Sequence, residues 1–392
     1  MYGTEHSDRS GTDVSASGRY IRNVTRLGGE PYKRKGREIK MQIIEILKEA
    51  AAMSASDIYI ITGANLSFKV NGKLIQKEGE ILKPDATKDL VYQIFDVAGI
   101  DVSDTRDVRR ELDFSFSIAG VGRFRANIYR QRGSFSAVLR FVPFELPKAE
   151  DIGIPDSVIE LANSKNGIVL ITGAAGNGKS TTLACLIDYI NKNRSGHIIT
   201  IEDPIEFLHR HNKCIISQRE INIDTNSYLD ALRAVLRQSP DVILLGEMRD
   251  YETINVAMTA AETGQLVFST LHTLGAANTI DRIIDVFPTS QQHQIRIQLS
   301  MVLKAVISQQ LLPSVDGKLV PAFEIMTMNS AIRTMIREEK THQIDAVIQA
   351  SQGMETMDNS IVNMFRKGII TADTAVEYAY NPELMEKRVK LQ

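Results

Sequence analysis

The sequence predicts an α/β protein: a smaller α+β domain, then a larger domain with a mostly parallel sheet and a helical C-terminal region. The chain has 392 residues, which is more than one hydrophobic core usually serves. Between residues 167 and 273, apolar strands alternate with helices. Between residues 112 and 142, apolar and polar residues alternate as they do in antiparallel strands. We therefore expect an extension over 1–40, a first domain over 41–147, a linker over 148–155 and a second domain over 156–392.

The first forty residues hold few large apolar side chains, and nine Lys or Arg against five Asp or Glu. Their net charge is +4, and because the whole chain stands at −2, residues 41–392 carry −6. This composition predicts a disordered basic extension. Contact of the basic run 33–37 with an anionic lipid or a nucleic acid is the less favoured alternative.

From Met41 the pattern becomes that of a compact α+β domain. Apolar residues at Ile43, Ile44 and Leu47 indicate an amphipathic helix, and a second helix is expected over about 87–97. Asn71-Gly72 lies between two apolar runs and predicts a hairpin turn. Strands are expected over 57–62, 67–70, 112–118, 122–130 and 136–142.

The second domain is expected to begin its helices at about 180, 227 and 253, each one between two apolar strands. Beyond Pro288 the pattern is largely helical. The longest helix is expected over 291–312, with shorter ones over 329–339 and 360–367.

Composition excludes several classes of protein. Hydrophobic content of 43% and charged content of 24% are those of an ordinary globular protein. No apolar run is long enough to cross a bilayer, and no signal peptide opens the chain, so a cytoplasmic location is expected. Two cysteines rule out a four-cysteine zinc site. The net charge of −2 gives no general case for nucleic-acid binding.

One stretch of eight residues matches the phosphate-binding pattern G-x-x-x-x-G-K-[ST]. It follows the apolar strand GIVLIT and opens a helix, so its backbone N–H groups and the helix N-terminus are expected to hold a phosphate. Lys179 is expected to reach the β- and γ-phosphates of ATP, and the Ser180 hydroxyl to ligate Mg²⁺. The predicted nucleotide-binding residues are Gly173, Ala174, Ala175, Gly176, Asn177, Gly178, Lys179, Ser180 and Thr181.

Polar residues follow three more apolar strands of this domain. Glu202, Asp203 and Glu206 end one strand, Glu247 ends the next, and His272 ends the third. Because ligands bind at the carboxyl ends of parallel strands, these side chains are expected to face the phosphates. Taken singly, the acids also fit a solvated loop, and His272 fits a structural histidine.

Three arginines of the first domain are further candidates. Arg123 and Arg125 are two apart on a predicted strand and share a face, and Arg140 lies on the next strand. A guanidinium on one domain can reach a phosphate held by another. A solvated basic sheet face is the alternative.

The segments GAAGNGKST, ITIEDPIEF, ILLGEMRD and TGQLVFSTLHT resemble, in order, the Walker A, Asp, Walker B and His boxes of type II/IV secretion ATPases. Within that superfamily the chain looks like the twitching-motility (PilT-type) pilus-retraction ATPases. GRFRANIYRQRG, SQREI and TIDRIIDVFP support this, and AIRTMIREEK is close to a motif associated with retraction. The resemblance extends from about Met41 to Pro382.

The resemblance implies a PAS-like first domain, a RecA-like ATPase domain and a homohexamer that binds ATP and Mg²⁺ between the two domains. It implies Glu206 as the catalytic glutamate, Glu247 as the Walker B acid near Mg²⁺, and His272 as the second histidine of the His box. Arg123, Arg125 and Arg140 fall in the segments that supply phosphate-contacting arginines.

The implied function is ATP-driven retraction of a type IV pilus. The resemblance implies a cytoplasmic motor at the inner face of the cytoplasmic membrane, and the implied partner of this motor is a pilus platform protein. A pilus-assembly or type II secretion ATPase is the alternative, although such proteins commonly carry a four-cysteine zinc element and an extra N-terminal domain. A DNA translocase or conjugation ATPase is less favoured because residues 41–392 are acidic. The chain departs from the family at Gln265, which replaces the first histidine of the His box, and at Tyr59.

Overall fold

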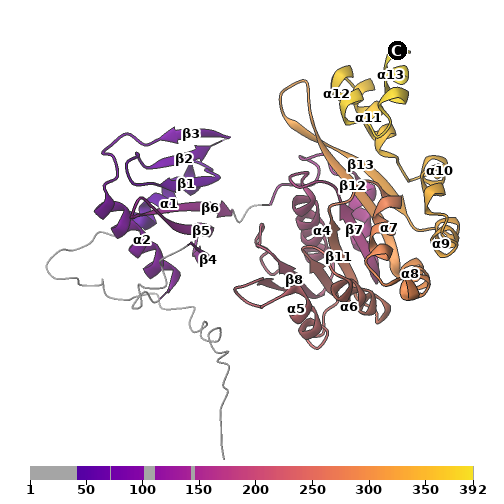
Figure 1. The fold of residues 1–392 in the computed structure, drawn as a ribbon, viewed down its shortest axis with the longest axis horizontal. Helices are drawn as coiled ribbons and strands as arrows, with labels where there is room; N and C mark the ends of the chain where they lie inside the picture. Colours follow the sequence, from indigo (N-terminus) through magenta and orange to yellow (C-terminus); the bar gives the residue numbers. More distant parts are fainter. Residues whose placement is uncertain (1–41, 71, 101–110, 143–145, 392) are drawn as a thin grey trace, which may run out of the picture.

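The computed structural model describes residues 42–70, 72–100, 111–142 and 146–391. These residues form two domains, each with its own sheet and its own hydrophobic core (Figure 1). The mixed α/β fold with a helical C-terminal region is as the sequence predicted. The expected extension over 1–40 lies outside the described residues, as does Asn71 of the expected hairpin turn.

The N-terminal domain is a six-stranded antiparallel sheet in the order β3-β2-β1-β6-β5-β4. Two helices, α1 and α2, pack on one face through their apolar sides. The elements are α1 (Gln42–Ala52), β1 (Asp57–Ile60), β2 (Ser67–Val70), β3 (Lys73–Gln76), α2 (Pro84–Ala98), β4 (Leu112–Ile118), β5 (Gly122–Gln131) and β6 (Ser134–Val142).

The two faces of this sheet differ in chemistry. Phe124, Ala126 and Ile128 of β5 are fully buried under the helices. Arg123 and Arg125 alternate with them and therefore point to the other face. Arg125 pairs in register with Arg140 of β6, so all three arginines share this helix-free face.

The larger domain is a seven-stranded sheet in the order β13-β12-β7-β11-β10-β8-β9, parallel except where β12 meets β13. Its central strands are buried along their whole length because helices cover both faces. The strands are β7 (Gly167–Thr172), β8 (Gly196–Glu202), β9 (Cys214–Glu220), β10 (Val242–Leu245), β11 (Leu266–Leu271), β12 (Leu303–Pro313) and β13 (Leu319–Thr327).

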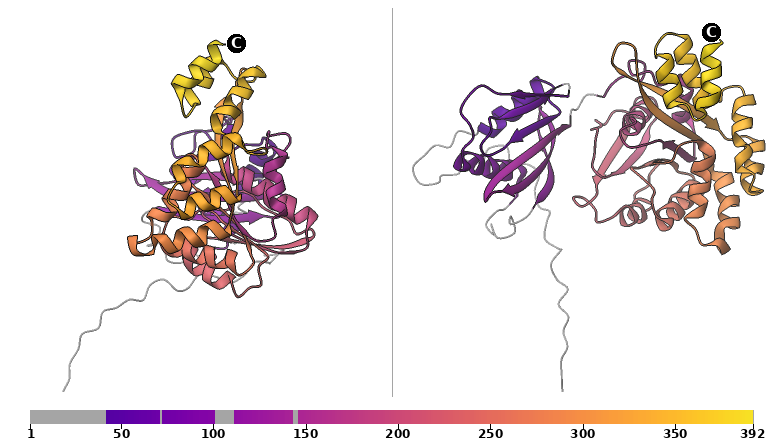
Figure 2. Two further views of the ribbon diagram at one scale, coloured as in Figure 1. Left: turned by 90° about the vertical axis from the view of Figure 1, so that its right-hand side faces the viewer. Right: turned by 45° about the horizontal axis from the view of Figure 1, so that its top comes forward.

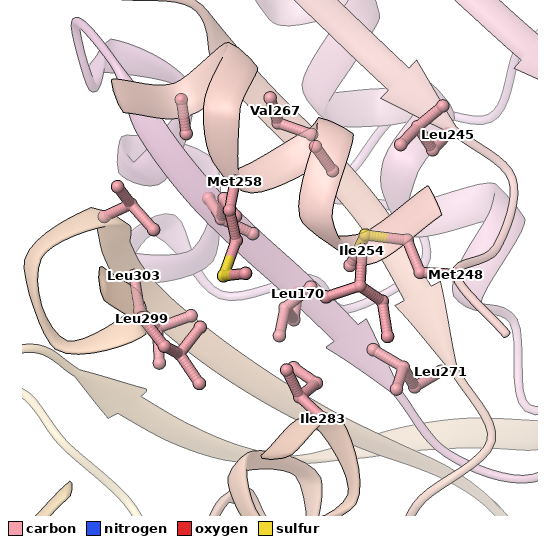
Figure 3. Close-up of a cluster of buried hydrophobic side chains, with 14 of the residues drawn as sticks. Leu170, Leu245, Met248, Ile254, Met258, Val267, Leu271, Ile283, Leu299 and Leu303 are labelled. Atoms are coloured by element: carbon pink, nitrogen blue, oxygen red, sulfur yellow. The ribbon is translucent and has the colours of Figure 1, made fainter. Parts of the chain in front are cut away.

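One face of this sheet packs against α3, the 3₁₀ helix η2 and α4, and the other against α5 to α10. Figure 3 shows the second of these cores, where Leu170 and Val267 of the sheet meet the helical side chains Met258, Ile283 and Leu299. The bounds are α3 (Asp156–Ile159), η2 (Glu160–Asn163), α4 (Lys179–Asn193), α5 (Tyr228–Val235), α6 (Tyr251–Glu262), α7 (Ala276–Asp285), α8 (Thr289–Val302), α9 (Ser330–Arg337), η3 (Thr341–Gln343) and α10 (Ile344–Ala350).

The prediction of one long helix over 291–312 was wrong. Helix α8 ends at Val302, and the chain continues as β12, which pairs with β7 in parallel and with β13. Nearly every residue from Leu303 to Ile307 is buried, and a continuous apolar run of this kind does not distinguish a buried strand from a buried helix.

Three C-terminal helices form a separate cluster beside the β12–β13 hairpin (Figures 1 and 2). They are α11 (Met357–Arg366), α12 (Ala372–Tyr378) and α13 (Pro382–Lys390), and they pack on Leu312 and Ala322. In the segment AIRTMIREEK, Ile332 and Ile336 of α9 are buried, whereas Arg337 is exposed. Within the described ranges, none of the helices has the length and apolarity needed to cross a membrane.

Glu324 of β13 is a buried acid away from the phosphate loop. Its side chain is 3% exposed and accepts a hydrogen bond from the backbone N–H of Ala276 at 2.7 Å. Burial raises the pKa of this carboxyl to about 7, although the hydrogen bond from Ala276 opposes the shift. A raised pKa means that the folded protein holds a proton that the unfolded chain has already lost.

Glu324→Gln is therefore expected to stabilise the protein above pH 7. In wild type this group costs nothing below pH 4.5, and its cost grows as the pH rises toward 7, reaching about 3 kcal/mol. The neutral amide avoids that cost and keeps an oxygen for Ala276. Thermal unfolding should show a midpoint raised by roughly 5 °C at pH 8 and much less at pH 5. Equal destabilisation at both values would mean that the ionised carboxylate itself stabilises the fold.

Candidate active site

The phosphate loop connects the carboxyl end of β7 to helix α4, as the sequence predicted. Gly173, Gly176 and Gly178 all have positive φ angles, of 137°, 81° and 79°. Gly178 immediately precedes Lys179, the first residue of α4. Glycine adopts these angles without strain, so the loop folds around an open space at the helix N-terminus.

Strand β12 holds the loop from the side. A Cβ atom at Gly173 would lie 2.3 Å from the backbone oxygen of Gln309, so no residue but glycine fits there. The Gln309 side chain accepts a hydrogen bond from the Thr182 hydroxyl at 2.7 Å. Asn177 turns toward the same strand and accepts a bond from the N–H of Leu311 at 3.3 Å. Sequence reasoning missed Gln309 because it lies in the segment predicted as helix.

Lys179 is folded back onto its own loop. Its ammonium group donates to the carbonyl oxygens of Gly173 at 2.7 Å and Ala174 at 2.9 Å, and the residue is 7% exposed. Burial lowers the pKa of Lys179, while the carboxylates of Glu206 and Glu247 oppose that shift. The only positive side chain of the loop is therefore held between weak neutral acceptors, which a phosphate can replace.

A cleft of about 380 Å³ opens above the loop at the carboxyl ends of β8, β10 and β11. Ser180 donates a hydrogen bond to Glu206 at 2.9 Å, which brings the helix N-terminus and the β8 loop together. The predicted residues that line the cleft are Ala175, Gly176, Gly178, Lys179, Ser180, Thr181, Glu202, Asp203, Glu206, Glu247 and His272.

Glu247, the acid that follows β10, lies beside an arginine and a histidine. Arg249 lies 2.7 Å from its carboxylate, and the Nε2 atom of His272 lies 3.6 Å from the same oxygen. His272 follows β11 at the cleft end, whereas Gln265 lies at the opposite end of that strand. The residue that replaces the first histidine of the His box is therefore remote from the cleft within this chain.

Gly246, which precedes Glu247, lies close to Tyr228. A Cβ atom at Gly246 would lie 2.7 Å from the Tyr228 hydroxyl, so a larger residue there would require that side chain to shift. Burial raises the pKa of Tyr228, and the nearby carboxylate of Glu247 adds to the rise. Nearby, burial also raises the pKa of Glu202 to about 7, although hydrogen bonds from Thr200 and Gln218 favour its charged form.

The three candidate arginines do not line the cleft in the described part of the chain. Arg123 reaches the larger domain, where its guanidinium lies 2.7 Å from Glu220 of β9. Arg140 bonds to Asp57 of its own domain at 3.0 Å, and Arg125 is exposed. The arginine-bearing face therefore meets the larger domain at β9 and leaves Arg125 and Arg140 outside the site.

The residues present fit a nucleoside triphosphate and a magnesium ion. The glycine cradle, the buried lysine and the helix N-terminus supply donors for phosphate oxygens. The hydroxyl of Ser180 and the carboxylate of Glu247 are hard oxygen ligands of the kind that Mg²⁺ takes beside phosphates. Together the fold and this site define a P-loop ATPase.

Comparison with known proteins agrees with this class. Residues 33–320 match the model of the family "Type II/IV secretion system protein". The type IV pilus retraction ATPase PilT of Pseudomonas aeruginosa is 43% identical over 345 residues, which is 88% of this chain and 99% of that protein. A crystal structure of the pilus retraction motor PilT with bound ADP superposes with a TM-score of 0.81 at 46% identity, covering 89% of this chain and all of that one.

The type II secretion proteins are more distant. Protein E of Xanthomonas campestris pv. campestris is 30% identical over 69% of this chain, and the match spans only 47% of that longer protein. This chain therefore belongs to the type II/IV secretion system family and, within it, to the twitching-motility (PilT-type) ATPases.

Proposed function

We propose that this chain hydrolyses ATP, with Mg²⁺, in a homohexameric motor that powers the retraction of type IV pili. The observation that carries the proposal is the convergence of Lys179, Glu206 and Glu247 in one cleft above the phosphate loop. This arrangement provides a cation for phosphate and two carboxylates for water and metal. The 43% identity to a pilus retraction ATPase, over almost the whole length of that protein, supports retraction rather than assembly of the pilus.

Binding begins when phosphate oxygens replace the carbonyls of Gly173 and Ala174 around the Lys179 ammonium. The exchange is favourable because an anion attracts the ammonium far more strongly than two neutral oxygens do. Ser180 is then free to leave Glu206 and turn its hydroxyl toward the metal site. Mg²⁺, when bound, neutralises charge on the β- and γ-phosphates.

Release of Ser180 also frees the carboxylate of Glu206, which is exposed to the cleft. In this position Glu206 orients a water molecule toward the γ-phosphate and accepts its proton. Glu247 lies deeper, between Arg249 and His272, and would hold the metal or its water. His272, which lies near the same Glu247 oxygen as Arg249, would sense the presence of the γ-phosphate.

Arg123, Arg125 and Arg140 complete the proposed site when the N-terminal domain closes over the nucleotide. Because Arg125 and Arg140 are exposed on the helix-free face, they are available to a phosphate or to a neighbouring subunit. In a ring, hydrolysis would move one domain against the other and pass force to a platform protein at the inner face of the cytoplasmic membrane. We assign no role to zinc or nucleic acid.

Deleting the gene and counting surface pili tests the direction of force. A retraction motor predicts cells that carry several times more pili than wild type and do not twitch, since assembly continues unopposed. The alternative, an assembly ATPase, predicts bald cells. A normal pilus number after deletion would remove the protein from the pilus machinery.

A further inference from the structure

Two side chains of strand β9 hydrogen-bond to the loop that carries Glu206, one on each side of that residue. The backbone N–H of Ile205 donates to Glu220 at 3.3 Å, and the side-chain amide of Gln218 donates to the carbonyl of Phe207 at 2.8 Å. Ile205 and Phe207 are the two neighbours of Glu206 in the chain. The direction in which the Glu206 carboxylate points therefore depends on these two side chains of β9.

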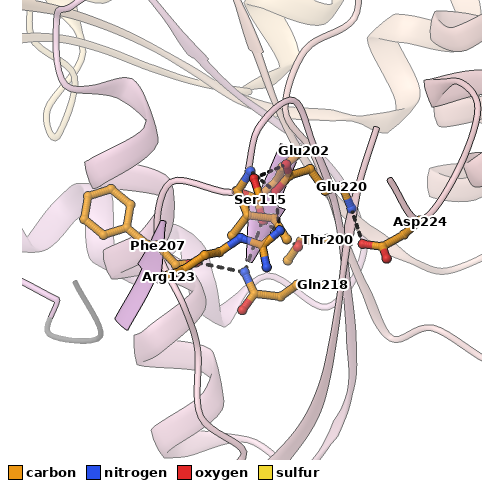
Figure 4. A network of polar contacts seen from close by, with 9 residues as sticks. Ser115, Arg123, Thr200, Glu202, Phe207, Gln218, Glu220 and Asp224 are labelled. Atoms are coloured by element: carbon orange, nitrogen blue, oxygen red, sulfur yellow. Dashed lines mark hydrogen bonds and ion pairs between the residues drawn. The ribbon is translucent and has the colours of Figure 1, made fainter. Parts of the chain in front are cut away.

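Glu220 is also the point where the N-terminal domain meets this strand (Figure 4). Arg123 donates to one carboxylate oxygen at 2.7 Å, and Ser115 donates to the other at 2.8 Å. The side chains of Arg123 and Glu220 are 14% and 5% exposed. A carboxylate buried to this degree needs its cation, so the pair resists separation unless another charge compensates.

The same oxygen of Glu220 accepts from both Arg123 and Ile205. A displacement of Arg123 therefore changes the hydrogen bond between the Ile205 N–H and Glu220, which fixes the Glu206 loop. Closure of the N-terminal domain on a nucleotide requires such a displacement, because Arg123 does not line the cleft in the present arrangement.

We propose that Glu220 is a positioning residue with two roles. It orients Glu206 through Ile205, and it competes with the phosphates of ATP for Arg123, so that domain closure and alignment of Glu206 occur together. The inference rests on the proposed function, because it assumes that Glu206 and Arg123 act on bound ATP. The identity of the nucleotide and the roles of the other site residues are unaffected by it.

Two substitutions separate these roles. Glu220→Gln keeps an oxygen for Ile205 but removes the charge that retains Arg123, so KM for ATP should fall about fivefold with kcat nearly unchanged. Glu220→Ala removes both interactions, so KM should fall similarly while kcat drops roughly tenfold or more, because Glu206 is no longer aligned. A residue with only a structural role would not divide kcat from KM in this way.

The measurement is steady-state ATP hydrolysis by the full-length protein, with a fluorescent ATP analogue for direct binding. Glu252→Gln is the matched control: it removes an exposed pair with Arg233 on the same domain and should leave both constants at wild-type values. A KM that is unchanged or raised in Glu220→Gln overturns the competition for Arg123, and an unchanged kcat in Glu220→Ala overturns the alignment of Glu206. If the alanine variant does not fold, KM of the glutamine variant decides.

Failure of the proposed function would look different. In that case the wild-type protein would show no ATP turnover, or Glu206→Gln would be as active as wild type. Failure of the inference alone leaves wild type active and Glu206→Gln inactive, while both Glu220 variants behave like Glu252→Gln.

Discussion

Lys179→Ala is expected to reduce ATP turnover to background, a loss of roughly a thousandfold. Lys179 is the cation of the phosphate loop and is almost fully buried. Its ammonium group donates to two neutral carbonyl oxygens, which phosphate oxygens would replace. Without it, no side chain of the loop compensates charge on the β- and γ-phosphates. Phosphate release from ATP, measured at saturating Mg²⁺, provides the test.

The control for Lys179→Ala is Lys192→Ala on the same helix. Lys192 makes an exposed pair with Asp188 one turn away, far from the helix N-terminus, and its removal should leave turnover unchanged. Turnover in Lys179→Ala within a few-fold of wild type would show that the phosphate loop is not where ATP is hydrolysed.

Glu206→Gln is expected to lower kcat by roughly a hundredfold or more while ATP still binds. The amide keeps the size of the side chain and its hydrogen bond with Ser180, but it cannot accept a proton from water. Binding of a fluorescent ATP analogue should therefore stay within a few-fold of wild type. If Glu206→Gln and wild type turned over ATP equally fast, Glu206 would not be the catalytic base, and the neighbouring Glu202 would be the next residue to examine.

The sequence predicted the phosphate loop and the strand ends because their signals are local. Glycines at fixed spacing, a strand before them and a helix after them define the loop, and the parallel sheet brings Glu206, Glu247 and His272 to the same edge. Five of the six strands of the N-terminal domain were likewise predicted, the longer ones from alternating polarity, as Phe124 and Arg125 of β5 illustrate. Strand β3 was not predicted, because all four of its residues are exposed and carry no buried pattern.

The parts that were not predicted depend on contacts between distant segments. Strand β12 looked like a helix because it is buried on both faces, and the role of Gln309 was lost with it. Strand β9 was missed because it is an edge strand that ends in polar residues and exposes Ile215. The N-terminal partners of Glu220, Arg123 and Ser115, lie 97 and 105 residues away along the chain. A local sequence pattern cannot predict a contact over such a separation.

The central claim is that hydrolysis in this cleft drives pilus retraction. Its most direct test is to label surface pili in a strain that lacks the gene, supply either wild-type protein or Glu206→Gln, and record by microscopy how many extended pili shorten. We expect wild type to restore retraction and Glu206→Gln to leave nearly all pili extended, although both proteins are present at equal amounts. Retraction at the wild-type frequency with Glu206→Gln would contradict the account.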